Sequence, residues 1–190
     1  MSNSYGSNLD EYGFERYEEN VFPIAYLITF RTFGTWLHGD DRGSMQRTSD
    51  PRFGTVLIDR HVPLFEQRAR DMRQPAVILN LEQRRCIEEA FWETCSFRGY
   101  ALRAVNVRSN HAHSVISAPV KPEKIVNDLK VNATKQLRHA GLVGEQEKVW
   151  SRGASTRYLW KPRHVDAAIE YVLYSQGDVP FEAVTEIPED

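Results

Sequence analysis

The 190-residue sequence predicts an α+β fold of the ferredoxin-like type, in which an antiparallel sheet carries helices on one face and a further helix follows at the C-terminal end. Three observations predict it. Short segments are rich in aromatic and β-branched residues, which is typical of strands. Longer segments repeat apolar residues every three or four positions, which is typical of amphipathic helices. The two kinds follow each other as strand, helix, strand, strand, helix, strand, helix, and the first six match the split β-α-β-β-α-β pattern. This pattern puts the helices on one face of the sheet and leaves the other face free for a site.

Each expected element has its own local signal. Asn80 and Gln83 form a capping-box pattern at the start of the first helix, and Gly99 ends it. Ser109 and Asn110 can turn a hairpin between two strands. The expected elements are strand 25–32, helix 80–98, strands 101–108 and 112–118, a helix from 122 that ends at 141, strand 157–160 and helix 164–176.

The charge distribution divides the chain. Residues 1–20 hold five acidic side chains and one basic, and residues 178–190 hold five acidic side chains and no basic one. The body between them holds 23 basic and 16 acidic side chains, the weak footprint of a protein that binds a polyanion. We therefore expect acidic tails at 1–20 and 179–190 around one domain at 21–178. Within that domain, residues 38–78 show little periodicity and are expected to be an irregular insertion.

Several classes of protein are excluded by composition. No apolar run approaches the roughly 20 residues that span a bilayer, and the polar, acidic N-terminal segment does not resemble a signal peptide. Cys86 and Cys95 fall in one expected helix, about 13.5 Å apart along its axis, too far for a disulfide. These features predict a cytoplasmic protein without a membrane partner.

The sharpest local motif is His111-Ala112-His113, inside an expected strand. Residues i and i+2 of a strand point to the same face, about 6.6 Å apart along the chain. Two imidazoles placed in this way can converge on one metal ion. The alternative interpretation is a pair of half-exposed histidines on a sheet face that bind nothing.

The expected last helix carries Tyr171 and Tyr174, followed by Gln176. At about 100° per residue, Tyr171 flanks the apolar stripe of the helix and Tyr174 points away from it. Tyr171 can therefore lie against the sheet, whereas Tyr174 faces solvent or another subunit. The alternative for a helix tyrosine is a half-buried packing residue.

Basic and aromatic residues alternate between Lys148 and Arg163. Basic side chains can follow a nucleic-acid backbone while aromatic rings stack on unpaired bases. The alternative is that Trp150 and Trp160 anchor the core and the basic residues form a solvated rim. The candidate DNA-binding residues are Arg152, Arg157, Tyr158, Trp160, Lys161 and Arg163.

Four segments carry a resemblance to a known family. They are ITFRTFGTWLHGDDRGS, VRSNHAHSVI, KPEKIVNDLKVNATKQLR, and RYLW with HVDAAIEYVLYSQGD. In order and spacing they resemble the single-tyrosine HUH transposases, which include the enzymes of the smallest insertion sequences and the REP-associated tyrosine transposases. The resemblance runs from about Ala25 to Asp178 and is weakest at 45–78. It implies an HUH endonuclease-like fold and a metal-dependent transposase that cuts and rejoins DNA.

The resemblance also implies a metal site. His111 and His113 match the two histidines that bind a divalent ion, and Ala112 stands where the family usually has a larger apolar residue. The family's third ligand is a Gln or Asn, commonly four residues after the tyrosine. Ser175 holds that position here, so Gln176 is the expected third ligand. A ligand set of His, His and Gln favours Mn²⁺ in vitro, with Mg²⁺ the expected ion in cells.

The resemblance further implies that Tyr171 attacks a phosphate of single-stranded, hairpin-containing DNA and forms a 5′-phosphotyrosine, with Tyr174 as the alternative nucleophile. It implies a homodimer, in which the tyrosine of one subunit can serve the histidines of the other. Three other functions stay open. They are a catalytically inactive nucleic-acid-binding module, a REP-associated nuclease that serves the host, and a different metal hydrolase that uses the histidine pair with an acidic residue.

Overall fold

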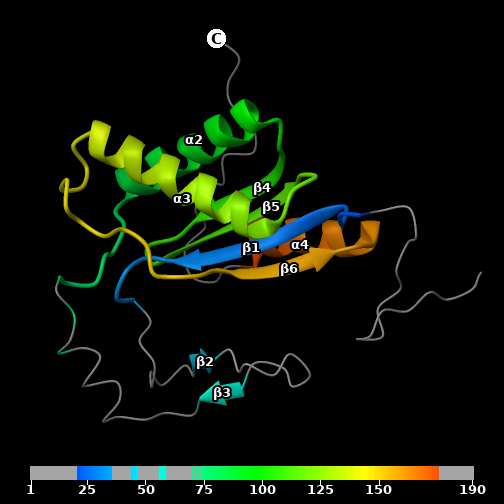
Figure 1. Cartoon of the computed structure of the whole chain (residues 1–190), viewed down its shortest axis with the longest axis horizontal. Coiled ribbons are helices and arrows are strands. Elements are labelled where there is room, and N and C mark those ends of the chain that lie inside the picture. The colour runs from blue at the N-terminus through cyan, green and yellow to red at the C-terminus, as the bar shows by residue number, and fades with distance from the viewer. Residues whose placement is uncertain are drawn as a thin grey trace, which may run out of the picture.

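The computed structural model describes residues 21–35, 44–46, 56–58, 70, 72 and 74–175. A four-stranded antiparallel sheet has helices α2 and α3 on one face and helix α4 on the other (Figure 1). The elements of this body are β1 (Ala25–Arg31), α2 (Leu81–Arg98), β4 (Ala101–Val107), β5 (His111–Ser117), α3 (Pro122–His139), β6 (Ser155–Leu159) and α4 (Pro162–Tyr174).

The strand order of the sheet is β4-β5-β1-β6, and each neighbouring pair is antiparallel. The first strand of the chain therefore lies in the middle of the sheet, and α2 and α3 make the two crossovers on the same face. This is the arrangement that the split β-α-β-β-α-β pattern predicts. The predicted α+β, ferredoxin-like fold is confirmed.

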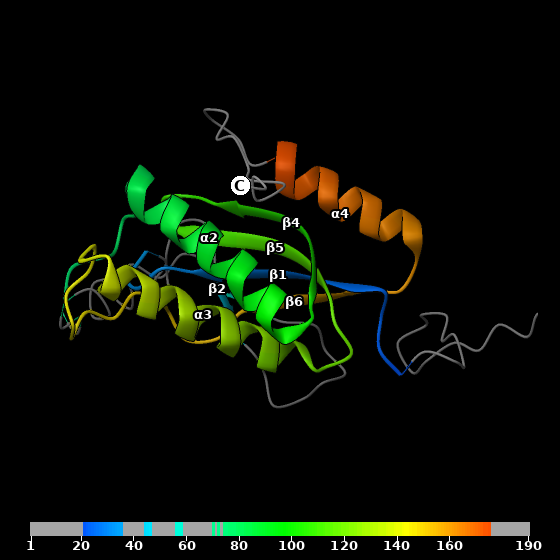
Figure 2. The same ribbon diagram turned by 90° about the horizontal axis from the view of Figure 1, so that it is seen from above.

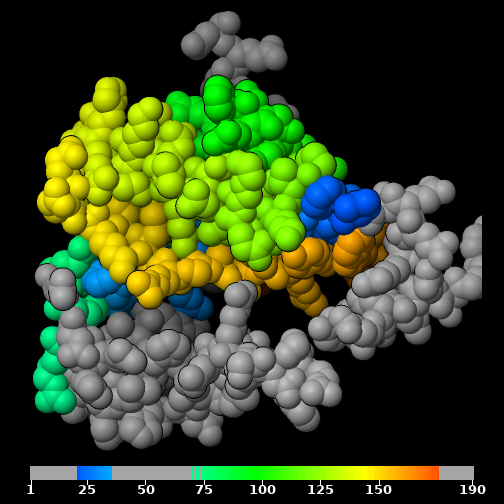
Figure 3. All heavy atoms as spheres, viewed as in Figure 1, coloured from blue at the N-terminus to red at the C-terminus, as the bar shows by residue number. Residues whose placement is uncertain are grey.

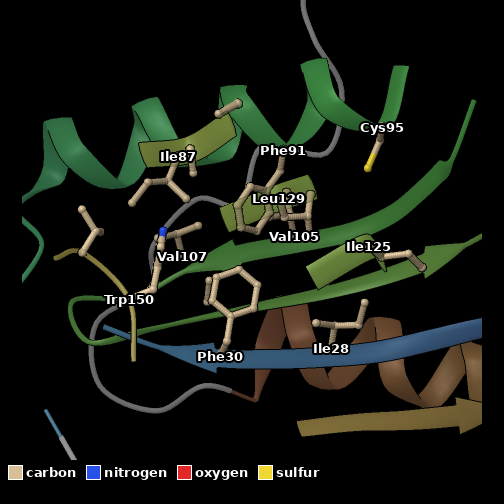
Figure 4. Close-up of a cluster of buried hydrophobic side chains, with 14 of the residues drawn as sticks. Ile28, Phe30, Ile87, Phe91, Cys95, Val105, Val107, Ile125, Leu129 and Trp150 are labelled. Atoms are coloured by element: carbon tan, nitrogen blue, oxygen red, sulfur yellow. The ribbon is translucent and has the colours of Figure 1, made fainter. Parts of the chain in front are cut away.

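The larger hydrophobic core lies between the sheet and the α2–α3 layer (Figure 4). Phe30 on β1 reaches into it and meets Phe91 on α2, with 5.8 Å between ring centroids. Trp150 packs edge-on against Phe30 at 4.9 Å. Cys86 and Cys95 are both free thiols, as predicted.

The ends of α2 follow the predicted signals. The Asn80 side chain accepts a hydrogen bond from the backbone of Gln83, and the Gln83 side chain accepts one from the backbone of Asn80. Gly99 ends the helix in the left-handed conformation, with φ of 68°, which glycine adopts without a steric penalty.

A smaller hydrophobic cluster lies on the opposite face, where α4 packs along the sheet (Figure 2). Val165, Ala168 and Val172 are its buried helix residues, and Ile169 lies at its margin. The sequence had left this face free of helices. That expectation is wrong because the apolar stripe of α4 requires a surface to cover it, and the sheet provides one.

The boundaries differ from the predicted ones in places. Helix α4 begins at Pro162 instead of His164, because proline is favoured in the first helical turn, and it ends at Tyr174. Strand β6 begins at Ser155, two residues earlier than predicted. The expected tails 1–20 and 179–190 lie outside the described residues. Within the described part of the chain, no helix combines the length and apolar character needed to cross a membrane.

The segment between β1 and α2 is not irregular throughout. Strands β2 (Ser44–Gln46) and β3 (Val56–Ile58) form an antiparallel pair within the expected insertion 38–78. We call the segment between Phe33 and Val77 the excursion. Its two ends lie together beside the four-stranded sheet, where the backbone N–H of Val77 donates a hydrogen bond to the carbonyl of Phe33 at 2.9 Å.

Candidate active site

The two predicted metal-binding histidines converge on one face of β5. Their ring centroids are 4.5 Å apart and the rings meet at 84°. His113 is only 5% exposed, whereas His111 is half-buried at the start of the strand. The alternation of side chains along a strand brings the two rings together, as the sequence predicted.

Each imidazole is oriented by a neighbouring side chain. The Nδ1 atom of His113 lies 2.7 Å from the hydroxyl of Thr29, its cross-strand neighbour on β1. The Nδ1 atom of His111 lies 2.5 Å from the Asn110 side-chain oxygen, which can only accept and therefore places the proton on Nδ1. With Nδ1 engaged in this way, Nε2 is the nitrogen that each ring would offer to a metal ion.

Tyr171 completes this group of side chains from α4. Its ring centroid lies 5.7 Å from that of His113, and the rings are nearly perpendicular, at 83°. Tyr171 is 42% exposed, so a substrate can reach it, whereas Tyr174 is 79% exposed and is absent from this group of ring contacts. The structure therefore places Tyr171 against the sheet and Tyr174 toward solvent, as their positions on the helix predicted.

A further polar residue under α4 was missed by the sequence analysis. Asn106 on β4 is paired with His113 in the sheet register and is 1% exposed. Its side-chain Nδ2 donates to the backbone carbonyl of Val172 at 2.9 Å. The available signal was a single amide in the otherwise apolar second half of the segment ALRAVNV.

The described residues supply two of the ligands that a divalent metal ion would need. Two oriented imidazoles supply two of the ligands that transition-metal ions accept. Among the described residues, no third His, Cys, Asp or Glu side chain joins them to form a metal-binding group. Gln176, the expected third ligand, lies outside the described residues.

The basic and aromatic run from Lys148 to Arg163 does not form one surface. Trp150 is buried in the larger core, which is the core-anchor alternative that the sequence had left open for this ring. Side chains alternate along β6: Tyr158 meets Tyr26 on the α3 side, whereas Leu159 belongs to the cluster under α4.

The candidate DNA-binding residues therefore face two ways. Tyr158 is 46% exposed and stacks on Trp160, with 6.3 Å between centroids and 20° between ring planes. Arg157 lies two residues before Leu159 on β6 and pairs with Leu27, so the alternation assigns it, like Leu159, to the α4 side. Lys161 is the N-cap of α4 and Arg163 lies in its first turn. Strand β6 forms the yellow-orange band along the margin of α3 in Figure 3.

Arg152 lies in a different setting, at a pocket of about 440 Å³ between α3 and the loop that precedes β6. Lys130 on α3 lines the same pocket and donates hydrogen bonds to the carbonyls of Ser151 and Gly153, at 2.9 Å and 2.6 Å. Burial lowers the pKa of Lys130 to about 8. The ammonium group therefore fastens the loop to α3.

Comparison with known proteins assigns this chain to a protein family. A family model described as "Transposase IS200 like" matches residues 72–184. The structure of a REP-associated tyrosine transposase bound to a REP hairpin is similar, with 12% identity over 85% of this chain and 70% of that chain and a TM-score of 0.47. A protein of Deinococcus radiodurans R1 that is provisionally named a transposase is similar, with 10% identity over 87% and 100% of the two chains and a TM-score of 0.41.

Among curated proteins, none matches this chain. The family model alone spans well over half of the sequence and includes the histidine pair and the tyrosine helix. The chain therefore belongs to the family of IS200-like transposases.

Proposed function

We propose that this chain is a single-stranded DNA endonuclease and strand transferase that acts in DNA transposition through a 5′-phosphotyrosine intermediate on Tyr171. The observation that carries the proposal is the contact of Tyr171 with His113, because it brings the ring that bears an oxygen nucleophile to two imidazoles suited to a metal ion. The family supports the transposase role.

The chemical step balances without another reactant. The Tyr171 oxygen attacks the phosphorus of a phosphodiester, its proton leaves, and the bond from phosphorus to the 3′ oxygen breaks. The departing strand gains a proton and ends in a 3′-hydroxyl, while the other strand stays on the tyrosine. The phosphodiester energy is kept in this covalent bond, so a 3′-hydroxyl can reverse the step and join a new strand.

His111 and His113 would hold the divalent ion, Mn²⁺ or Mg²⁺, and Gln176 is the proposed third ligand. When bound, such an ion supplies positive charge against the oxygens of the reacting phosphate. Thr29 and Asn110 orient the two imidazoles for this purpose. Replacing either histidine with alanine is expected to abolish cleavage while the fold persists, since neither ring belongs to a hydrophobic core cluster.

The proposed partner is single-stranded DNA that contains a hairpin, as the resemblance to the family implies. Arg152, Arg157, Lys161 and Arg163 would contact phosphates, and Tyr158 with Trp160 would stack on unpaired bases. Binding should weaken as salt rises, and it should favour single strands over blunt duplex. A homodimer is part of the proposal.

The decisive experiment compares two tyrosine variants that differ only in position. The wild-type chain, Tyr171→Phe and Tyr174→Phe are incubated with a pool of single-stranded oligonucleotides and Mn²⁺ and separated on a denaturing gel. The wild type and Tyr174→Phe should form a covalent protein–DNA adduct, and Tyr171→Phe should bind DNA but form none. The reverse pattern transfers the role to Tyr174. DNA binding without any wild-type adduct would assign an inactive nucleic-acid-binding module.

A further inference from the structure

A row of three polar side chains crosses the sheet beneath α4. Thr29 on β1 and Asn106 on β4 are the two cross-strand partners of His113 on β5. Thr29 holds the His113 ring from one side. Asn106, on the other side, makes its hydrogen bond to α4. The row therefore links the histidine site to the helix that carries the tyrosine.

The hydrogen bond from Asn106 reaches a carbonyl in the last turn of α4, where carbonyls lack a donor within the helix. The last four carbonyls of a helix have no N–H group within the helix to bind them, and α4 ends at Tyr174. The N–H of Ser175 donates a hydrogen bond to the carbonyl of Tyr171, and the Nδ2 of Asn106 donates one to the carbonyl of Val172 at 2.9 Å. The sheet thus caps the last turn of the helix through one side chain, one residue away from Tyr171.

Core stability does not explain this amide. Asn106 is 1% exposed, and among the described residues its Oδ1 atom has no hydrogen-bond partner. A buried polar atom without a partner is destabilising, whereas an apolar residue of similar size would avoid that cost. The hydrophobic cluster on this face of the sheet includes Val115 and Val172, which are both fully buried. A leucine at position 106 would therefore match the apolar character of this face.

We propose that Asn106 is a positioning residue, which fixes the last turn of α4 on the sheet and so keeps Tyr171 against the histidine pair. It acts through the backbone of Val172 and does not touch the substrate. The effect on cleavage rests on the proposed function of Tyr171, whereas the effect on the position of α4 does not.

The test replaces Asn106 with leucine, which keeps the size and removes the donor, and with alanine, which removes both. Asn132→Leu is the matched control, because the Asn132 amide also donates to a helix backbone carbonyl, that of Ala90 at 3.1 Å, but joins α3 to α2 far from the tyrosine. Hydrogen exchange of the full-length chain measures whether the amides of α4 become less protected while those of β5 do not.

Both Asn106 variants should show faster exchange in α4, and Asn106→Leu, which keeps the packing, should melt closer to the wild type than Asn106→Ala does. The single-turnover rate of adduct formation should fall about tenfold to a hundredfold, since a small misplacement of a reacting group has effects of this size. The dissociation constant for the oligonucleotide should stay within about twofold, because a positioning residue affects the reacting geometry more than ground-state binding. Asn132→Leu should leave the α4 exchange and the rate unchanged.

Unchanged protection of α4 in both Asn106 variants overturns the proposal, whatever the activity. So does a normal rate of adduct formation in both variants. A wild-type chain that forms no adduct on any oligonucleotide overturns the proposed function, and the exchange data then still decide whether Asn106 holds the helix.

Discussion

The Thr29 hydroxyl is the smallest group in the site with a directional role. It lies 2.7 Å from Nδ1 of His113, and this contact holds the ring plane and leaves Nε2 as the nitrogen that would face a bound metal ion. Valine has nearly the same shape but no hydroxyl. Thr29→Val should therefore fold normally while the His113 ring loses its orientation.

We expect Thr29→Val to raise the Mn²⁺ concentration needed for half-maximal adduct formation by about tenfold, in line with other residues that orient a metal ligand. Titration of the adduct yield against Mn²⁺ measures it. Thr156→Val is the control, because Thr156 on β6 pairs with Ile28, whose side chain lies in the core on the other face of the sheet. Equal shifts in both variants would contradict a specific role for Thr29.

Lys130 predicts a pH dependence of stability. Its folded pKa, about 8, is below the ordinary value of 10.5 because burial disfavours the charged amine. Between those two values the unfolded chain binds more protons than the folded one, so the contribution of Lys130 to the free energy of unfolding rises with pH across this window. Because the amine stays partly exposed, solvent screening limits the gain to about 1 kcal/mol.

Urea unfolding of the wild type and of Lys130→Met at pH 7 and pH 10 isolates this effect, since other titrating groups cancel in the difference. The wild type should gain stability relative to the variant at the higher pH. A difference that is constant with pH, or that falls, would contradict the assignment.

At the residue scale, the sequence revealed the groups whose chemistry is unusual for their setting. His111 and His113 stand out in a strand, and Tyr171 is placed by helical periodicity. Asn106 and Lys130 could not be assigned, because their roles depend on backbone carbonyls of Val172, Ser151 and Gly153 that come from distant parts of the chain.

The elements differ in how strongly their ends are specified. Helix α2 has reciprocal hydrogen bonds between Asn80 and Gln83, and the Gln83 side chain also donates to the carbonyl of Leu142 at 2.8 Å. The N-cap of α4, Lys161, makes no side-chain capping bond. The predicted start of α2 was right, whereas the predicted start of α4 was two residues late because the helix-favouring Pro162 of its first turn was not counted.

Removal of the α2 cap should be measurable. Asn80→Ala leaves the N–H of Gln83 without its acceptor and should lower the free energy of unfolding by about 1 kcal/mol. Asn127→Ala is the control, because Asn127 is exposed within α3, where alanine is the better helix former. Equal destabilisation of the two variants in urea would show that the cap makes no specific contribution to the free energy of unfolding.

Short elements escaped the sequence analysis for a physical reason. Strands β2 and β3 have three residues each, too few to show an alternating pattern. Helix α4 was found, but the surface it covers was not, because periodicity shows that a face is buried without showing against what. The pairing of β1 with both β5 and β6 likewise depends on contacts between residues far apart in sequence.

For the whole molecule, the position of α4 bears on which subunit supplies the nucleophile. Within one chain Tyr171 already meets His113, and the same helix buries Val165, Ala168 and Val172 against its own sheet. A transfer of the helix to a partner subunit would have to separate this cluster from its own sheet before the same contacts could form on the partner's sheet. We therefore expect the tyrosine to act on the histidine pair of its own chain.

Mixing two inactive variants tests this expectation. One chain carries Tyr171→Phe and the other carries His111→Ala together with His113→Ala. If each tyrosine serves its own histidines, no adduct should form at any mixing ratio. An adduct on the histidine-deficient chain, made larger by a tag so that it can be identified, would instead show exchange of the helix between subunits.

The junction of Phe33 and Val77 has a consequence for the history of such a chain. Because the backbone bond between them closes the base of this segment, insertions and deletions in its middle should cost mainly closure entropy, about 0.6 kcal/mol for each doubling in length. Lineages could thus lengthen, shorten or exchange this region without refolding the sheet. The freedom stops at the base itself: Gly34 has φ of 73°, and a side chain there would meet Met72 and Ala76 at 2.8 Å and 3.0 Å. We therefore expect the sequence and length of the excursion to vary among related proteins, but the glycine at its first turn to be retained.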